Sequence, residues 1–258
     1  MFELFSDFFA CRDNILSRMD PRPKLVIAVT LILVVVRSST VALPCTVLVC
    51  CTATMIALCI PLRVVALRMT APLGIVVVLL VLQTFMTGTT RLFVLPVGSW
   101  TLVATEEGLM RGILMGLRVL GAVGVILLLS SVTPAYKIFH ALRWFRVPEG
   151  WVEIALLVYR YAFALIDQAS EVATAQRVRL GYVGLRRSLR SLGVLAGTVI
   201  TRASDQAMRT YEAMMLRGYQ GTIPFAPLSP MSTRERGIMC VVPILLAGAH
   251  FLIERLSG

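Results

Sequence analysis

The chain of 258 residues has few charged side chains for its length. Charged residues make up 15% of it and hydrophobic residues 57%, whereas a soluble domain is about a quarter charged and nearer half apolar. A soluble core of this size does not need so many long apolar runs. The scarcity of charge therefore excludes an ordinary soluble protein, and the sequence predicts an all-α integral membrane protein.

Histidine and lysine are almost absent. The two histidines, His140 and His250, are too few and too far apart in sequence for a zinc or nickel site. The six cysteines show no C-x-x-C spacing, and the chain has no G-x-x-x-x-G-K-[ST] phosphate-binding motif. We therefore predict a chain that is not an enzyme, with no catalytic residue, no cofactor and no metal site of its own.

Acidic residues are also scarce relative to basic ones, with 14 Asp and Glu against 25 Lys and Arg. A net charge of +11 suits nucleic-acid binding. Here the basic residues flank apolar runs, which is the pattern of cytoplasmic loops in membrane proteins. We expect contact with a lipid bilayer and no nucleic-acid partner.

Apolar runs predict about five transmembrane helices, at 25–36, 41–62, 71–86, 112–132 and 237–253. Basic residues before the first run and between the second and third place the N-terminus in the cytoplasm and the C-terminus outside. Arg118, inside the fourth run, is expected either to pair with a partner subunit or to extend to the membrane surface. The predicted division is 1–133 and 237–258 as transmembrane helices and 134–236 as a cytoplasmic coupling region.

The cytoplasmic region holds 14 of the 25 basic residues. Its pattern predicts a short helix at 134–145 and two long amphipathic helices at 151–180 and 185–217. Gly193 and Gly197 form a small-x-x-x-small pair, which favours a close crossing of the two long helices. A glycine pair without a packing role is the alternative.

The two long helices have similar ends. The first ends in Val178-Arg179-Leu180, before Gly181 and Tyr182, and the second in Leu216-Arg217-Gly218, before Tyr219. Glycine stops a helix cheaply, and a cation favours a helix C-terminus, so each end alone suits ordinary capping. Two matching ends 38 residues apart favour a second interpretation, in which each arginine binds a carboxylate-lined groove of a partner.

These ends, together with the opening stretch MDPRPKL at residues 19–25, resemble a known family. The chain is similar to the T component of energy-coupling-factor (ECF) transporters, and most similar to the Q subunit of cobalt and nickel importers, the CbiQ family. Family members open with Asp-Pro-Arg-x-Lys-Leu and centre both coupling motifs on Ala-Arg-Gly. Here Val178 and Leu180 flank the first arginine, and Leu216 precedes the second.

The resemblance implies a membrane scaffold in the plasma membrane of a prokaryote. Its partners are two cytoplasmic ATPase subunits and a substrate-binding membrane subunit of the metal-binding type, and a small accessory membrane subunit is left open. The resemblance makes Val178, Arg179, Leu180, Leu216, Arg217 and Gly218 the ATPase-docking residues. ATP hydrolysis by the partners then moves the two long helices and reorients the substrate-binding subunit.

Two other functions are compatible with parts of the pattern. A vitamin-importing complex of the same kind is the first, because the resemblance assigns substrate choice to the binding subunit. A self-sufficient transporter or channel is the second, although such proteins usually carry acidic residues or broken helices at the membrane midplane. The predicted spans contain no Asp or Glu.

Overall fold

A computed structural model describes residues 19–58, 60, 62–86, 91–97, 100–222 and 231–257. The chain forms two compact units, Met1–Ile138 with Pro230–Gly258, and Phe139–Ser229. Both ends of the chain, including Arg12 and Arg18 of the basic N-terminal segment, lie outside the described residues. The expected orientation of the chain therefore stays a prediction.

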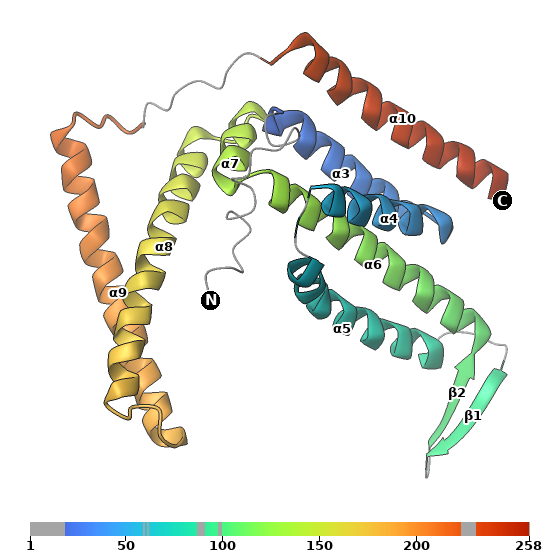
Figure 1. Ribbon diagram of the computed structural model, residues 1–258, viewed down its shortest axis with the longest axis horizontal. Coiled ribbons are helices and arrows are strands. Elements are labelled where there is room, and N and C mark those ends of the chain that lie inside the picture. The colour runs from blue at the N-terminus through green and yellow to red at the C-terminus, as the bar shows by residue number, and fades with distance from the viewer. Residues whose placement is uncertain are drawn as a thin grey trace. The chain divides into compact units, whose positions relative to one another are not determined.

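The first unit is a group of helices arranged around α6 (Figure 1). Helix α6 (Glu106–Val132) packs against α3 (Pro21–Arg37), α4 (Ala42–Ala57) and α5 (Leu62–Met86). Helix α10 (Thr233–Ser257) packs against α3. A small core joins three of these helices through Ala28, Cys51 and Val125.

The helix lengths are those of a helical membrane protein. Among the described residues, Arg63–Met86 and Glu106–Val132 are long and apolar enough to cross a bilayer, and Ala42–Ala57 is a shorter apolar helix. The first two apolar runs form separate helices, because α3 ends at Arg37 and α4 begins at Ala42. The count of five spans stays a prediction.

One short β-hairpin, which the sequence did not predict, lies between α5 and α6 in the otherwise helical part of the chain that the structure describes. Strand β1 (Arg91–Val97) pairs antiparallel with β2 (Trp100–Thr105), and Val97 lies opposite Trp100. Both segments are rich in β-branched, aromatic and other large apolar residues, which suit a pleated strand. Because α6 begins at Glu106, directly after β2, this hairpin leads into the central helix.

A row of glycines lets α6 approach its neighbours closely. Its buried glycines are Gly108, Gly112, Gly116, Gly121 and Gly124. A Cβ atom added to Gly112 would lie 3.2 Å from the Cα of Leu80, and one added to Gly116 would lie 2.7 Å from Cγ1 of Val76. The helix therefore packs against α5 through Gly112 and Gly116, a small-x-x-x-small pair that was not among the sequence predictions.

Arg118 forms a contact within the chain, whereas the sequence led us to expect pairing with a partner subunit or extension to the membrane surface. Its Nε donates a hydrogen bond of 2.9 Å to the carbonyl oxygen of Ser38, and one terminal nitrogen donates to the same oxygen. Ser38 is the C-cap of α3 and is fully buried. The guanidinium thus lies at the negative end of the α3 dipole and binds one of its unpaired carbonyl groups.

The second unit consists mainly of an antiparallel pair of long helices. Helix α7 (Ala135–Trp144) leads to α8 (Glu149–Val178), and a short turn connects α8 to α9 (Leu185–Leu216) (Figure 1). The three helices expected here are present, with ends shifted by no more than two residues. An exposed ion pair between Arg143 and Glu149 spans the α7–α8 turn.

Candidate docking surfaces on the α8–α9 pair

The two arginines singled out from the sequence occupy equivalent backbone positions. Arg179 is the C-cap of α8, with φ −85° and ψ 16°, and Arg217 is the C-cap of α9, with φ −91° and ψ 8°. Both residues are exposed. No hydrogen bond or ion pair of their side chains is recorded within the described part of the chain. Each cation therefore lies at the negative end of a helix and faces outward.

The same pair of hydrogen bonds closes both helices. After α8, the N–H of Leu180 donates to the Arg177 carbonyl at 3.0 Å, and the N–H of Gly181 donates to the Gln176 carbonyl at 2.8 Å. After α9, the N–H groups of Gly218 and Tyr219 donate to the carbonyls of Met215 and Met214, both at 3.0 Å. Each set forms the Schellman motif, in which the residue after the cap is left-handed.

The left-handed residue differs between the two ends. Gly218 has φ +79°, whereas the equivalent residue at the first end is Leu180, with φ +56°. A leucine in this region clashes with its own backbone, at a cost of about 1–2 kcal/mol. The first motif therefore keeps the helix-end geometry of the second although leucine replaces the glycine.

Side-chain hydrogen bonds hold the first end in place. Tyr182 donates from its hydroxyl to Oε1 of Gln176 at 2.7 Å, and Nε2 of Gln176 donates to the Ser191 carbonyl at 3.0 Å. The Ser191 hydroxyl donates to the Gly181 carbonyl at 2.8 Å. This network ties the turn to both helices and supports the strained conformation of Leu180.

An exposed apolar residue lies next to each arginine in the chain. Val178 is 80% exposed beside Arg179, and Leu216 is 90% exposed beside Arg217. Five exposed arginines gather around the first end: Arg177, Arg179, Arg186, Arg187 and Arg190. Each end thus combines a cation with an exposed apolar side chain, a combination that suits a partner groove with an acidic wall.

The two ends lie far apart. The turn that carries Arg179 immediately precedes α9, and Arg217 caps the far end of the same helix (Figure 1). The 32 residues of α9 at about 1.5 Å each give a separation of about 48 Å. This exceeds the diameter of a small domain, about 30 Å, so a single small domain does not reach both ends.

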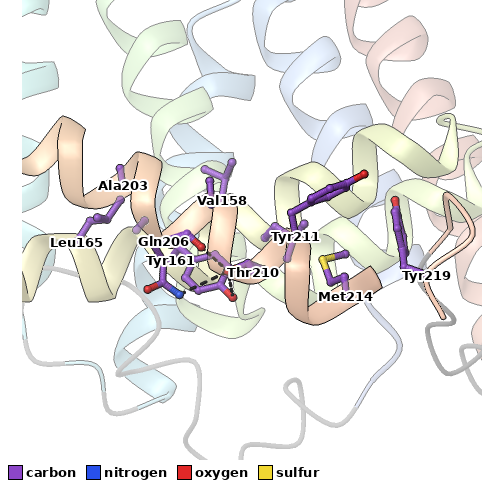
Figure 2. A pocket seen from close by; sticks show the side chains of 12 residues that line it. Val158, Tyr161, Leu165, Ala203, Gln206, Thr210, Tyr211, Met214 and Tyr219 are labelled. Carbon is purple, nitrogen blue, oxygen red and sulfur yellow. Dashed lines mark hydrogen bonds between the residues drawn. The ribbon is translucent and has the colours of Figure 1, made fainter. Parts of the chain in front are cut away.

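An open groove of about 570 Å³ lies between α8 and α9. Figure 2 shows Val158, Tyr161 and Leu165 of α8 on one side, with Ala203, Thr210 and Met214 among the α9 residues on the other. One hydrogen bond crosses it, from the Thr210 hydroxyl to the Tyr161 hydroxyl at 3.1 Å. The lining is otherwise almost entirely apolar, and Tyr219 of the second motif contributes to it.

The close crossing expected at Gly193 and Gly197 stays a prediction, and α8 does not meet these glycines. A Cβ atom added to either glycine would meet no described atom within 4 Å. The helices instead interact where Thr210 binds Tyr161 and where Ser191 binds Gln176. Gly193 and Gly197 share a face by their spacing, but that face is not covered by α8.

The opening motif lies in the first unit, at the N-terminus of α3. Pro21 occupies the first turn of the helix, where a missing N–H is harmless. The Glu235 carboxylate accepts hydrogen bonds from the N–H of Asp20 at 3.0 Å and the N–H of Ser232 at 3.1 Å. One acidic side chain thus joins the starts of α3 and α10. Among the described residues, no three His, Cys, Asp or Glu side chains gather as metal ligands.

The comparisons with known proteins point to one family. A family model described as CbiQ, cobalt transport protein, matches residues 12–225. The chain is 31% identical over 187 residues to the cobalt transport protein CbiQ of Rhodobacter capsulatus, covering 72% of this chain and 70% of the relative. It is 29% identical over 211 residues to an uncharacterized protein of Methanocaldococcus jannaschii, covering 81% and 79%.

A further relative is described as a fused protein. It is a fused cobalt transport protein, CbiMQ, of Methanocorpusculum labreanum, 26% identical over 162 residues, which cover 58% of this chain and 27% of the relative. Together the apolar helices and these matches define a membrane component of a transport system. The chain belongs to the CbiQ family of cobalt transport proteins.

Proposed function

We propose that this chain is the scaffold subunit of an ATP-driven importer of the energy-coupling-factor type. In this proposal Arg179 and Arg217, with Val178, Leu180, Leu216 and Gly218 beside them, each dock on one of two cytoplasmic ATPase subunits. Closure of the ATPases moves α8 and α9, and this movement reorients a substrate-binding membrane subunit. The chemistry of ATP belongs to the partners.

The observation that carries the proposal is the repeated helix end. Two outward-facing arginines occupy the same C-cap position of the same hydrogen-bonded motif, about 48 Å apart along one helix. Two partner subunits that close and open relative to one another can move this chain when each of them holds a separate point of it. Two attachment motifs with the same helix-end geometry, one before α9 and one at its far end, suit such an arrangement.

Cobalt is the proposed substrate, with nickel next. The family to which the chain belongs and the names of its relatives support cobalt. A vitamin-importing complex is the alternative within the same mechanism, because a separate subunit would select the substrate. The fused name of one relative supports a partner membrane subunit encoded beside this one.

The proposed location is the plasma membrane of a prokaryote, with five spans and a cytoplasmic N-terminus. The basic residues on either side of the apolar runs support this orientation. Residues 134–236 then lie on the cytoplasmic side, where ATPase subunits are available. Reporter fusions at Met1 and Gly258 test it, and both ends on one side of the membrane would refute the count of five.

The docking assignment is tested by charge reversal. Arg179→Glu and Arg217→Glu should each weaken co-purification with the ATPase, and the double variant should abolish uptake of radiolabelled cobalt. If each arginine only stabilises its helix end, its loss should lower the stability of the chain by only about 0.3–1 kcal/mol. If each arginine forms a buried charge pair with the ATPase, truncating it should weaken the binding free energy by about 2–5 kcal/mol. Charge reversal should weaken binding more, because the new carboxylate would face a carboxylate of the partner.

The matched control is Arg202→Glu, which reverses an exposed arginine in the middle of α9. It should leave co-purification and uptake close to the wild-type values. Normal co-purification and uptake for the Arg179→Glu/Arg217→Glu variant would mean that both arginines are merely helix caps. Uptake without any bound ATPase would instead favour a self-sufficient transporter.

A further inference from the structure

The segment that ends α8 and begins α9 carries an unbalanced positive charge. Residues 172–190 contain five arginines and no Asp or Glu, and we call this segment the basic turn. All five side chains are exposed: Arg177, Arg179, Arg186, Arg187 and Arg190. None of the five has a recorded hydrogen bond or ion pair with another residue that the structure describes. No described residue therefore supplies a counterion for the basic turn.

The fold gathers these arginines at one end of the helix pair (Figure 1). The Ser191 hydroxyl donates to the Gly181 carbonyl at 2.8 Å, and this bond holds the start of α9 beside the end of α8. Arg190 lies three and four positions after Arg187 and Arg186, and at these spacings like charges share a helix face and repel one another. An anionic surface that binds here relieves this repulsion.

The second end of the pair has no such excess. Residues 205–222 contain two arginines and two acidic residues: Asp205, Arg209, Glu212 and Arg217. The formal charge is therefore +5 over residues 172–190 and zero over residues 205–222. The two ends share one backbone motif, but their charges differ.

We infer that the basic turn attracts an acidic surface of an ATPase subunit, so that docking of the ATPases begins at the first end. This inference rests on the proposed function, in which each end docks on one ATPase subunit. Long-range attraction between opposite charges raises the association rate, whereas contacts made after docking act mainly on the dissociation rate. A protein is favoured over the anionic membrane surface as the partner. The second end has the same motif without the excess charge that attracts such a membrane.

The test is the association rate of the ATPase that co-purifies with this chain, measured on the full chain in phosphatidylcholine nanodiscs. The variant Arg186→Gln/Arg187→Gln/Arg190→Gln keeps Arg179 and removes three charges of the basic turn. At low salt its association rate constant should fall about tenfold, and its dissociation rate constant should change less than about threefold. The difference from the wild type should vanish at about 1 M salt, where charges are screened beyond about 3 Å.

The matched control is Arg160→Gln/Arg202→Gln/Arg209→Gln, which removes three exposed arginines elsewhere on α8 and α9. Arg202 is 12 positions after Arg190, or about 18 Å along α9. The control should associate at the wild-type rate. An equal fall for both variants, or no fall for the basic-turn variant, would overturn the inference and leave ATPase docking intact. If no ATPase co-purifies with the wild-type chain, the proposed function fails, and this inference fails with it.

A photoreactive amino acid at Leu185, which is 80% exposed within the basic turn, distinguishes a protein partner from the membrane. In membranes that contain phosphatidylglycerol, position 185 should form an adduct with the ATPase. Adducts with lipid alone, in a complex that still binds the ATPase, would place the basic turn on the membrane surface and overturn the inference.

Discussion

Arg118, in the middle of α6, binds the carbonyl oxygen of Ser38 at the end of α3, 80 positions earlier in the chain. The contact places a permanent cation at the negative end of a helix dipole, inside the unit that contains the apolar helices. It also explains how a charged residue is tolerated in an apolar helix, because its donors meet an acceptor within the same chain.

Replacing Arg118 should therefore destabilise the first unit. Arg118→Met keeps an unbranched side chain but leaves the buried Ser38 carbonyl without its donors. A hydrogen bond to a charged group contributes about 1.5–3 kcal/mol, and the loss should lower the melting temperature in detergent. Arg118→Lys should retain part of the effect. A melting temperature equal to that of the wild type for Arg118→Met would contradict the assigned role.

The glycine surface of α6 gives a second prediction. Gly112→Leu should push α5 and α6 apart, because even its Cβ atom meets backbone of Leu80 at 3.2 Å. Overpacking of this kind costs about 1–3 kcal/mol. The matched control is Gly74→Leu on α5, which faces open space and should gain up to about 1 kcal/mol of helix stability. Equal thermal stability of the two variants would exclude a close α5–α6 contact at Gly112.

The left-handed residues at the two helix ends give a third prediction, which concerns local stability. Gly218→Leu should destabilise the end of α9 by about 1–2 kcal/mol, because it introduces the strain that Leu180 already bears. Leu180→Gly should remove that strain and slow local opening. Hydrogen exchange at the Gly181 and Tyr219 amides reports both changes. Faster exchange at Gly181 in Leu180→Gly would show that the leucine side chain stabilises the turn.

The glycine pair of α9, Gly193 and Gly197, gives a fourth prediction. Gly193→Ala/Gly197→Ala should preserve the α8–α9 pairing and raise helix stability by about 1 kcal/mol per site, because neither Cβ meets a described atom. Circular dichroism during thermal unfolding measures the gain. If the double variant loses its membrane partners on co-purification, this face binds a helix of another subunit, and the glycines matter there.

The sequence was most informative where local signals agree. Helix stops after Arg179 and Arg217 followed from glycine and cation preferences, and the structure places both arginines as C-caps. Leu180 stands where the resembled family has glycine, and the sequence alone suggested that the first motif had changed. Backbone geometry shows that the leucine adopts the left-handed conformation of Gly218, held by hydrogen bonds that sequence spacing does not reveal.

Contacts between distant segments were beyond a reading of the sequence. The small-x-x-x-small rule drew attention to Gly193 and Gly197, whereas the close approach seen within this chain is at Gly112 and Gly116, where α5 lies against α6. The rule identifies a surface that permits close approach without naming the helix that uses it. Likewise, nothing in the spacing of Arg118 indicated Ser38, because the pairing depends on how α3 and α6 pack.

Direct contact of both helix ends with the ATPase is the central claim, and site-specific photo-crosslinking tests it. A photoreactive amino acid is placed at position 178 or 216, the most exposed apolar residue beside each arginine, and at the exposed Ile200 in the middle of α9 as the control. The assembled complex is then irradiated in membranes. Positions 178 and 216 should each form an adduct with an ATPase subunit, and position 200 should form none. Absence of an ATPase adduct from both 178 and 216, in a complex that still transports cobalt, would contradict the account.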